Sequence, residues 1–162
     1  YFGGLYAEGG LLIKQGREKG IDIPFMGGDG MGASTIVEIA GDSIKNTYNT
    51  SVAGDSTKTE TGQKFMEDYK KAYNKNPESY SVYGYDSMCT MLKGLEDAIK
   101  ANDNKLPTRK QVAEAVRAIK DYQGALTKVS FDEKGDNEFG KVFIYEFAEA
   151  KYPPQFEGEV GK

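Results

Sequence analysis

A glycine-rich segment, from Gly27 to Gly32, contains the acidic residue whose position most suggests binding chemistry. The letters Gly-Gly-Asp-Gly-Met-Gly follow a short apolar run, so Asp29 would lie at the carboxyl end of a strand, where open α/β sheets bind ligands. A phosphate-binding loop is disfavoured for two reasons. The Lys-Ser/Thr pair of a P-loop is missing, and the third glycine of the dinucleotide-binding motif is missing too, since Ala33 takes its place only in a shifted register. Two alternatives remain open: a carboxylate presented to a ligand, and a solvated surface turn.

Tyrosines form the second group with binding chemistry. The chain has 11 tyrosines and no tryptophan, and Tyr80, Tyr83 and Tyr85 lie close together. A tyrosine ring combines apolar area with one hydroxyl, which suits small-ligand pockets. Core packing accounts for Tyr85, which falls on an apolar helical stripe. Packing explains Tyr80 less well, because we expect this residue to lie in a loop after Pro77.

Two further candidates have simpler interpretations. Residues 132–136, Asp-Glu-Lys-Gly-Asp, miss the spacing of a calcium loop and place Lys134 where an oxygen ligand would be needed, which favours a charged turn between strands. Cys89 falls on the same apolar stripe as Met88 and Leu92, and no histidine is present to activate it. We therefore predict a buried core thiol.

Composition excludes several classes of protein. The 162 residues include no histidine and one cysteine, which removes histidine-dependent catalysis, cysteine-based zinc sites and intrachain disulfides. The net charge of −4, without any run of more than two basic residues, disfavours binding to nucleic acid or an anionic membrane. No apolar run approaches the roughly 20 residues of a membrane span, and no signal peptide opens the chain. Catalysis is the weaker expectation, and no metal or cofactor is predicted.

The elements that would position these residues alternate as in an α/β protein. Over the first fifty residues we expect the order β–α–β–loop–α–β. Residues 5–13 lead into a helix that closes at Gly20, residues 21–26 have the length of a strand, a short helix covers 34–39, and residues 47–52 form another strand.

The middle of the chain is predicted to be helical and the end to return to strands. Helical periodicity follows a polar segment, over residues 65–73, 82–99 and 107–119. Strands are expected at 129–131 and 142–145, with a mostly irregular tail from Pro153. This order suggests a chain that leaves one lobe and returns to it.

Taken together, four segments resemble the type I periplasmic solute-binding proteins, and in particular the leucine/isoleucine/valine-binding proteins of ABC importers. The segments are YFGGLYAEGGLLIKQGREKGIDIPFMGGDG, IAGDSIKNTY, NPESYSVYGYDSM and VSFDEKGD. They cover nearly the whole chain, in order. The resemblance implies an α/β fold, namely the C-terminal part of a two-lobe type I periplasmic-binding-protein fold with parallel sheets flanked by helices.

The resemblance also implies a division of the chain and a site. Residues 1–52 would end one ligand-binding lobe, residues 53–131 would end the other, mainly helical, lobe, and residues 132–162 would return to the first lobe and form the tail. The first strands of both lobes would be missing, together with the small hydroxyl residues that hold the ligand carboxylate in the family.

Four positions carry over from the family's ligand site. Asp29 matches an acidic residue that accepts the α-ammonium of a bound amino acid, and Tyr80 matches an aromatic residue of the opposite lobe that packs on the ligand side chain. Leu5 matches an aromatic residue whose hydroxyl helps to bind the ammonium. Leucine cannot form that bond, but the adjacent Tyr6 could take its place if the strand end shifts by one residue.

The function implied is that of the substrate-binding component of an amino-acid ABC importer, for branched-chain or similarly apolar amino acids. The partners would be the free amino acid and an ABC permease, and the location extracytoplasmic, either periplasmic or as a cell-surface lipoprotein. The alternative is a ligand-binding sensory module of a receptor or regulator with the same fold, although we expect a receptor to continue into a membrane helix, so ending at Lys162 favours transport. Alone, this chain is expected to bind ligand weakly and to self-associate through exposed sheet edges.

Overall fold

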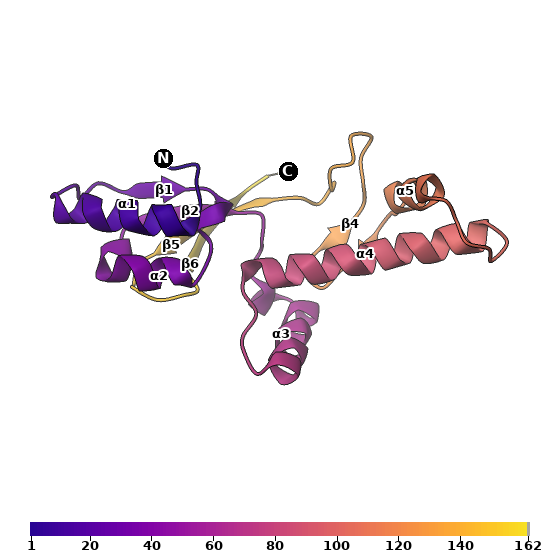
Figure 1. Ribbon diagram of the computed structural model, residues 1–162, viewed down its shortest axis with the longest axis horizontal. Helices are drawn as coiled ribbons and strands as arrows, with labels where there is room; N and C mark the ends of the chain where they lie inside the picture. Colours follow the sequence, from indigo (N-terminus) through magenta and orange to yellow (C-terminus); the bar gives the residue numbers. More distant parts are fainter. Residues whose placement is uncertain (162) are drawn as a thin grey trace. The chain divides into compact units, whose positions relative to one another are not determined.

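The computed structural model describes residues 1–161, which form two compact units (Figure 1). Unit 1 consists of residues 1–54 together with the residues from 141 onward, and unit 2 consists of residues 55–140. The chain therefore leaves unit 1 after Gly54 and re-enters it at Lys141. The assignment of residues 1–52, 53–131 and 132–162 to two lobes stays a prediction.

Unit 1 is built on a four-stranded mixed sheet. Its strands are β1 (Phe25–Gly27), β2 (Thr47–Ser51), β5 (Val142–Phe147) and β6 (Gln155–Val160), in the order β1-β2-β5-β6. β1 and β2 are parallel, whereas β5 is antiparallel to both of its neighbours. The fold is thus α/β as predicted, but only the first strand pair has the parallel arrangement.

Helices cover one face of this sheet. α1 (Tyr6–Glu18) precedes β1, and the crossover from β1 to β2 contains the 3-10 turn η1 (Asp29–Met31), α2 (Thr35–Ala40) and the 3-10 turn η2 (Gly41–Ile44). α1 packs against α2 beside the sheet (Figure 1). The buried apolar side chains of these elements form one core cluster: Ile13, Met31, Ile36, Ala40, Ile44 and Phe147.

Two expectations for unit 1 are wrong in their extent. The strand predicted over residues 21–26 is shortened to β1, because Arg17 donates to the carbonyl oxygens of Ile21 (2.6 Å) and Ile23 (2.7 Å) and holds that segment as a loop at the end of α1. The tail predicted to be irregular contains β6. β6 forms because it pairs with β5, where Tyr145 and Phe156 are register partners with ring centroids 6.0 Å apart.

Unit 2 contains three helices and a short hairpin. The helices are α3 (Glu60–Tyr73), α4 (Ser79–Ala101) and α5 (Arg109–Arg117), and the 3-10 turn η3 (Ser56–Lys58) precedes them. The hairpin pairs β3 (Tyr122–Gln123) with β4 (Lys128–Val129). α5 begins with a capping box, since Gln111 donates its backbone N–H to Thr108 Oγ1 (3.3 Å) and accepts the Thr108 N–H at Oε1 (2.8 Å).

Helix α4 buries a different face from the one that its apolar periodicity predicts. The buried residues recur every four positions and are mostly small or polar: Val82, Asp86, Thr90, Gly94 and Ala98. Gly94 lets α5 approach, because an added Cβ would lie 2.3 Å from Val116 Cγ2. Tyr85 on the apolar stripe is 52% exposed, so the core-packing interpretation of this residue is wrong.

The acidic segment after β4 is a turn, as predicted. Asp132 Oδ1 accepts the backbone N–H groups of Lys134, Gly135 and Asp136 at 2.8–2.9 Å. The hydrogen bond from Asp136, followed by those from the other two residues, lowers the pKa of Asp132. No cluster of three or more metal-ligating side chains occurs among the residues that the structure describes.

Membrane-spanning helices are absent from the described part of the chain: none of its helices combines the length and the apolar character that crossing a bilayer requires.

Candidate functional site

The loop that carries Asp29 leaves β1 at Gly27 and turns at once into η1. The Met31 N–H donates to the Gly28 carbonyl (3.2 Å), and the Gly32 N–H donates to the Asp29 carbonyl (2.9 Å). These two bonds close a tight turn at the carboxyl end of a strand that is parallel to its neighbour. Asp29 itself is exposed. The sequence prediction of an acidic residue at a strand end is therefore met by the local geometry.

The start of α1 lies against this loop. A Cβ added to Gly30 would lie 2.8 Å from the Gly4 carbonyl oxygen and 3.0 Å from Leu5 Cδ2. Phe2 holds this start of the chain beside β1. Its N–H donates to the Met26 carbonyl at 2.8 Å, and Phe2 forms a parallel bridge with Gly27. Glycine at position 30 is needed because any side chain there would push the two segments apart.

Three of the four sequence-predicted site residues thus belong to one region of unit 1. Leu5 is the N-cap residue of α1 and Tyr6 is its first residue, and α1 contacts η1. Leu5 is 61% exposed and Tyr6 is 37% exposed. Leu5 therefore places exposed apolar surface beside the residue that follows Asp29, and Tyr6 is the next residue along the chain. A carboxylate with apolar surface nearby suits a ligand with a cationic group and an apolar portion.

Tyr80 belongs to unit 2 and lies in the first turn of α4 rather than in a loop. α4 begins earlier than the apolar periodicity suggests, because a capping box forms there: the Glu78 N–H donates to Ser81 Oγ at 3.1 Å. Tyr80 is 47% exposed. Its proposed role against a ligand side chain stays a prediction.

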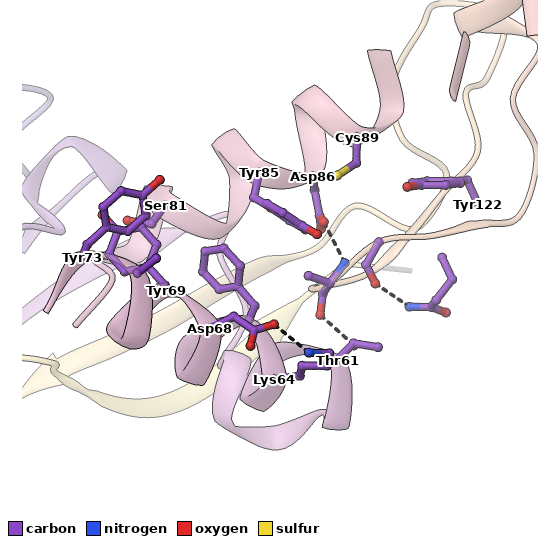
Figure 2. Close-up of a pocket in the computed structure, with 15 residues that line it drawn as sticks. Thr61, Lys64, Asp68, Tyr69, Tyr73, Ser81, Tyr85, Asp86, Cys89 and Tyr122 are labelled. Carbon is purple, nitrogen blue, oxygen red and sulfur yellow. Dashed lines mark hydrogen bonds and ion pairs between the residues drawn. The ribbon is translucent and has the colours of Figure 1, made fainter. Parts of the chain in front are cut away.

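Unit 2 also contains a hollow of about 590 Å³ that no sequence pattern indicated (Figure 2). It lies between α3, α4 and the segment that includes β3. Aromatic rings dominate its lining: those of Phe65, Tyr69, Tyr73, Tyr85 and Tyr122. Phe65 packs against Tyr85 and Tyr69, with ring centroids 5.2 Å and 5.7 Å apart. Sequence patterns do not indicate this hollow, because its residues come from three segments that are distant in the sequence.

Cys89 lines this hollow and is only partly buried, so the prediction of a core thiol is wrong. The thiol lies beside two phenols, because α4 turns its Tyr85–Cys89 side toward the hollow instead of the packed interface. The hydrogen bond with the Cys89 thiol raises the pKa of Tyr85. Burial, followed by the electrostatic effect of Cys89, raises the pKa of Tyr122. Both phenols therefore remain protonated at neutral pH.

The charged groups around the hollow are committed to contacts within unit 2. Lys64 and Asp68 form an ion pair on α3 with an Nζ–Oδ2 distance of 2.7 Å (Figure 2). Asp86 accepts the backbone N–H groups of Ala125 at Oδ1 (2.7 Å) and Leu126 at Oδ2 (3.0 Å). Through these two hydrogen bonds Asp86 holds the β3–β4 hairpin against α4, so its role is structural.

Comparison with known proteins connects these features to one family. The family described as periplasmic binding protein matches residues 2–151. The leucine-, isoleucine-, valine-, threonine- and alanine-binding protein of Pseudomonas aeruginosa is 34% identical over 148 residues, which are 91% of this chain and 37% of that protein. Leu/Ile/Val-binding protein homolog 1 of Brucella suis is 30% identical over 94% of this chain and 40% of that protein.

Solved structures give the same result for the fold. The crystal structure of the leucine-binding protein LivK from Thermotoga maritima superposes with a TM-score of 0.84 at 26% identity, covering 98% of this chain and 43% of that one. LivJ from Streptococcus pneumoniae, solved with isoleucine, superposes with a TM-score of 0.78 at 23% identity over 96% of this chain. The chain thus spans about two fifths of the length of the relatives that it matches.

Proposed function

The chain belongs to the periplasmic binding protein family, and from this premise we propose that it forms part of the substrate-binding component of an amino-acid ABC importer, with branched-chain or similarly apolar amino acids as ligands. The observation that carries the proposal is the exposed carboxylate of Asp29 on a tight turn at the carboxyl end of β1, against the start of α1. This is the end of a parallel strand pair where α/β folds bind ligands.

The chemistry of this region matches a free amino acid. A carboxylate that faces an α-ammonium group forms a charge-assisted hydrogen bond, which is stronger than a neutral one. Leu5 supplies exposed apolar surface beside the loop, and Tyr6 supplies a hydroxyl that could replace the one missing at position 5. Tyr80 of unit 2 is the residue proposed to pack on the ligand side chain.

The proposed role requires no catalysis and implies two partners. The relatives are named as binding proteins, in agreement with a protein that captures its ligand and releases it unchanged. In the whole protein the ligand would be a free amino acid, the recipient an ABC permease, and the location outside the cytoplasmic membrane.

Calorimetric titration of the whole protein tests the ligand class. We expect leucine, isoleucine and valine to bind, whereas 4-methylpentanoate, which has the carbon skeleton of leucine without its ammonium group, should not bind measurably. The 162-residue chain alone should give weak or undetectable heat, because it supplies only part of the contacts. Equal binding of leucine and 4-methylpentanoate to the whole protein would contradict the proposal.

We expect the 162-residue chain to self-associate at high concentration, chiefly through the apolar face of α4. On this face Tyr85, Met88 and Leu92 are 52%, 58% and 51% exposed. Contiguous apolar patches of this kind are uncommon on monomers and favour association. The edge strand β6 is a weaker candidate than expected, because its Glu157 would bring like charges together when two copies pair.

Concentration-dependent gel filtration measures this association. Combined replacement of Met88 and Leu92 by glutamine should shift the chain toward the monomer. Leu106→Gln is the control, since this side chain is 90% exposed in the loop before α5, outside the apolar face of α4. A chain that elutes as a monomer at every concentration would show that the α4 face does not drive association.

A further inference from the structure

The buried face of β2 is polar throughout. Thr47, Asn49 and Ser51 alternate along the strand and point to the same face, with exposures of 0%, 2% and 7%. A strand face packed against helices usually carries valine, isoleucine or leucine. The three polar side chains must therefore find hydrogen-bond partners inside unit 1.

Only some of these polar atoms have a hydrogen-bond partner within the chain. Ser51 Oγ accepts the Ala53 N–H at 3.0 Å, and Asn49 Nδ2 donates to the Thr50 carbonyl at 3.2 Å. Thr47 Oγ1 and Asn49 Oδ1 have no hydrogen-bond partner among the residues that the structure describes. Buried polar atoms nearly always have a partner, and where the protein supplies none the usual partner is an internal water molecule.

Both atoms lie on the face of the sheet that the Asp29 loop covers. Asn49 is the register partner of Gly27 on β1, so the two residues point to the same face. On that face Met31, the last residue of η1, packs so closely over Gly27 that an added Cβ would lie 1.9 Å from its sulfur. η1 also packs against β2 itself. The unpartnered oxygen of Asn49 thus belongs to the part of the sheet on which the Asp29 loop packs.

We propose that Thr47 and Asn49 hold an internal water molecule on this face and that Asn49, acting through this water, is a positioning residue for the Asp29 loop. Side chains two residues apart on a strand are separated by about 7 Å, so two hydrogen bonds to one water can join them when the side chains lean toward each other. The water donates one hydrogen to Asn49 Oδ1 and one to Thr47 Oγ1. The positioning role rests on the proposed function, whereas the water site does not.

Two matched substitutions in the 162-residue chain test the water site. Asn49→Thr and Asn49→Val have nearly the same shape, but only threonine retains a group that can bond to water. Nuclear magnetic resonance should detect a long-lived water near Thr47 and Asn49 in the unsubstituted chain and in Asn49→Thr, and should not detect it in Asn49→Val. The amide resonances of Asp29 and Met31 should shift in the valine variant alone.

Thermal melting shows that any change is not a loss of folding. Asn49→Val puts a β-branched apolar side chain, which strands favour, in place of the buried carboxamide and its water, so the variant should still fold and melt in one cooperative transition. In the whole protein the valine variant should bind leucine about tenfold more weakly, a loss typical of groups that orient a ligand contact, while the threonine variant should bind normally.

The outcomes separate the two proposals. Absence of the water from the unsubstituted chain, or equal loop resonances and equal leucine affinity in the valine and threonine variants, would overturn this inference. Failure of the unsubstituted whole protein to bind leucine would instead overturn the proposed function, and the water measurement would still decide whether the site on β2 exists.

Discussion

Replacement of Asp86 by asparagine is expected to lower the free energy of unfolding of unit 2 by about 3 kcal/mol, although the two side chains have the same shape. Asp86 is 8% exposed and uses both of its carboxylate oxygens, one for the Ala125 N–H and one for the Leu126 N–H. The asparagine amide has only one acceptor atom. Its NH₂ group would face the second backbone N–H, so that two donors would be buried against each other.

The surroundings of Asp86 prevent the structure from relaxing around this change. A Cβ added to Gly124 would lie 2.6 Å from Asp86 Oδ2 and 2.8 Å from the Thr127 carbonyl oxygen, so the hairpin already packs directly on the carboxylate. Moving the hairpin away would also break the bond from Thr61 Oγ1 to the Ala125 carbonyl (2.8 Å), which links α3 to the same segment (Figure 2). The loss therefore affects every element around the hollow.

Urea unfolding followed by circular dichroism, together with amide hydrogen exchange at Ala125 and Leu126, measures the effect. Asp68→Asn is the matched control, because the Asp68 side chain is 61% exposed and forms only a surface ion pair, for which about 0.5 kcal/mol is typical. Equal stability of the Asp86 and Asp68 variants would show that the hairpin is held mainly by other contacts.

Helix α4 shows what could be predicted from the sequence and what could not. Its apolar periodicity correctly indicates a helix, because recurrence every three to four residues is a local property of the chain. The buried face is a different one, since α5 packs at Gly94 and the hairpin packs at Asp86. Periodicity predicts which face is apolar, but the partners that this chain supplies decide which face is covered.

The C-terminal tail gives a second example. Pro153, Pro154 and two glycines weaken every local strand signal in residues 153–161. β6 nevertheless forms, because β5 offers it an edge and Tyr145 offers it an aromatic partner. Strand formation here depends on pairing rather than on propensity, and such pairing is invisible until the sheet is assembled.

The candidate site divides in the same way. Asp29 could be placed at a strand end from the sequence, because it follows a short apolar run, whereas only the family resemblance assigns Leu5 to the same site. The burial of Thr47 and Asn49 on one face of β2 could not be predicted, since a run of β-branched and tyrosine residues indicates a strand without indicating which of its faces is buried. Nor could the aromatic hollow, which requires three helix and hairpin segments to meet.

Asp29→Asn in the whole protein should weaken leucine binding by about 2–5 kcal/mol, which removes measurable affinity in most calorimetric conditions. The substitution preserves the shape of the side chain, so the turn at η1 and its approach to Gly4 should remain. The side chain loses its negative charge and one of its two acceptor oxygens becomes an NH₂ group, so it attracts an ammonium group far less strongly than a carboxylate does. The change therefore tests the polar contribution of Asp29 without changing the size of the side chain.

A control in the same unit makes the interpretation specific. Asp22→Asn removes an exposed carboxylate from the loop before β1, and it should leave leucine affinity unchanged while altering the net charge equally. If both variants bind leucine as the unsubstituted protein does, the ammonium is held elsewhere and Asp29 belongs to a solvated turn. If both lose affinity equally, the effect is one of overall charge, which added salt would screen. Loss in the Asp29 variant alone, persisting in high salt, is the result expected of a direct contact with the ligand.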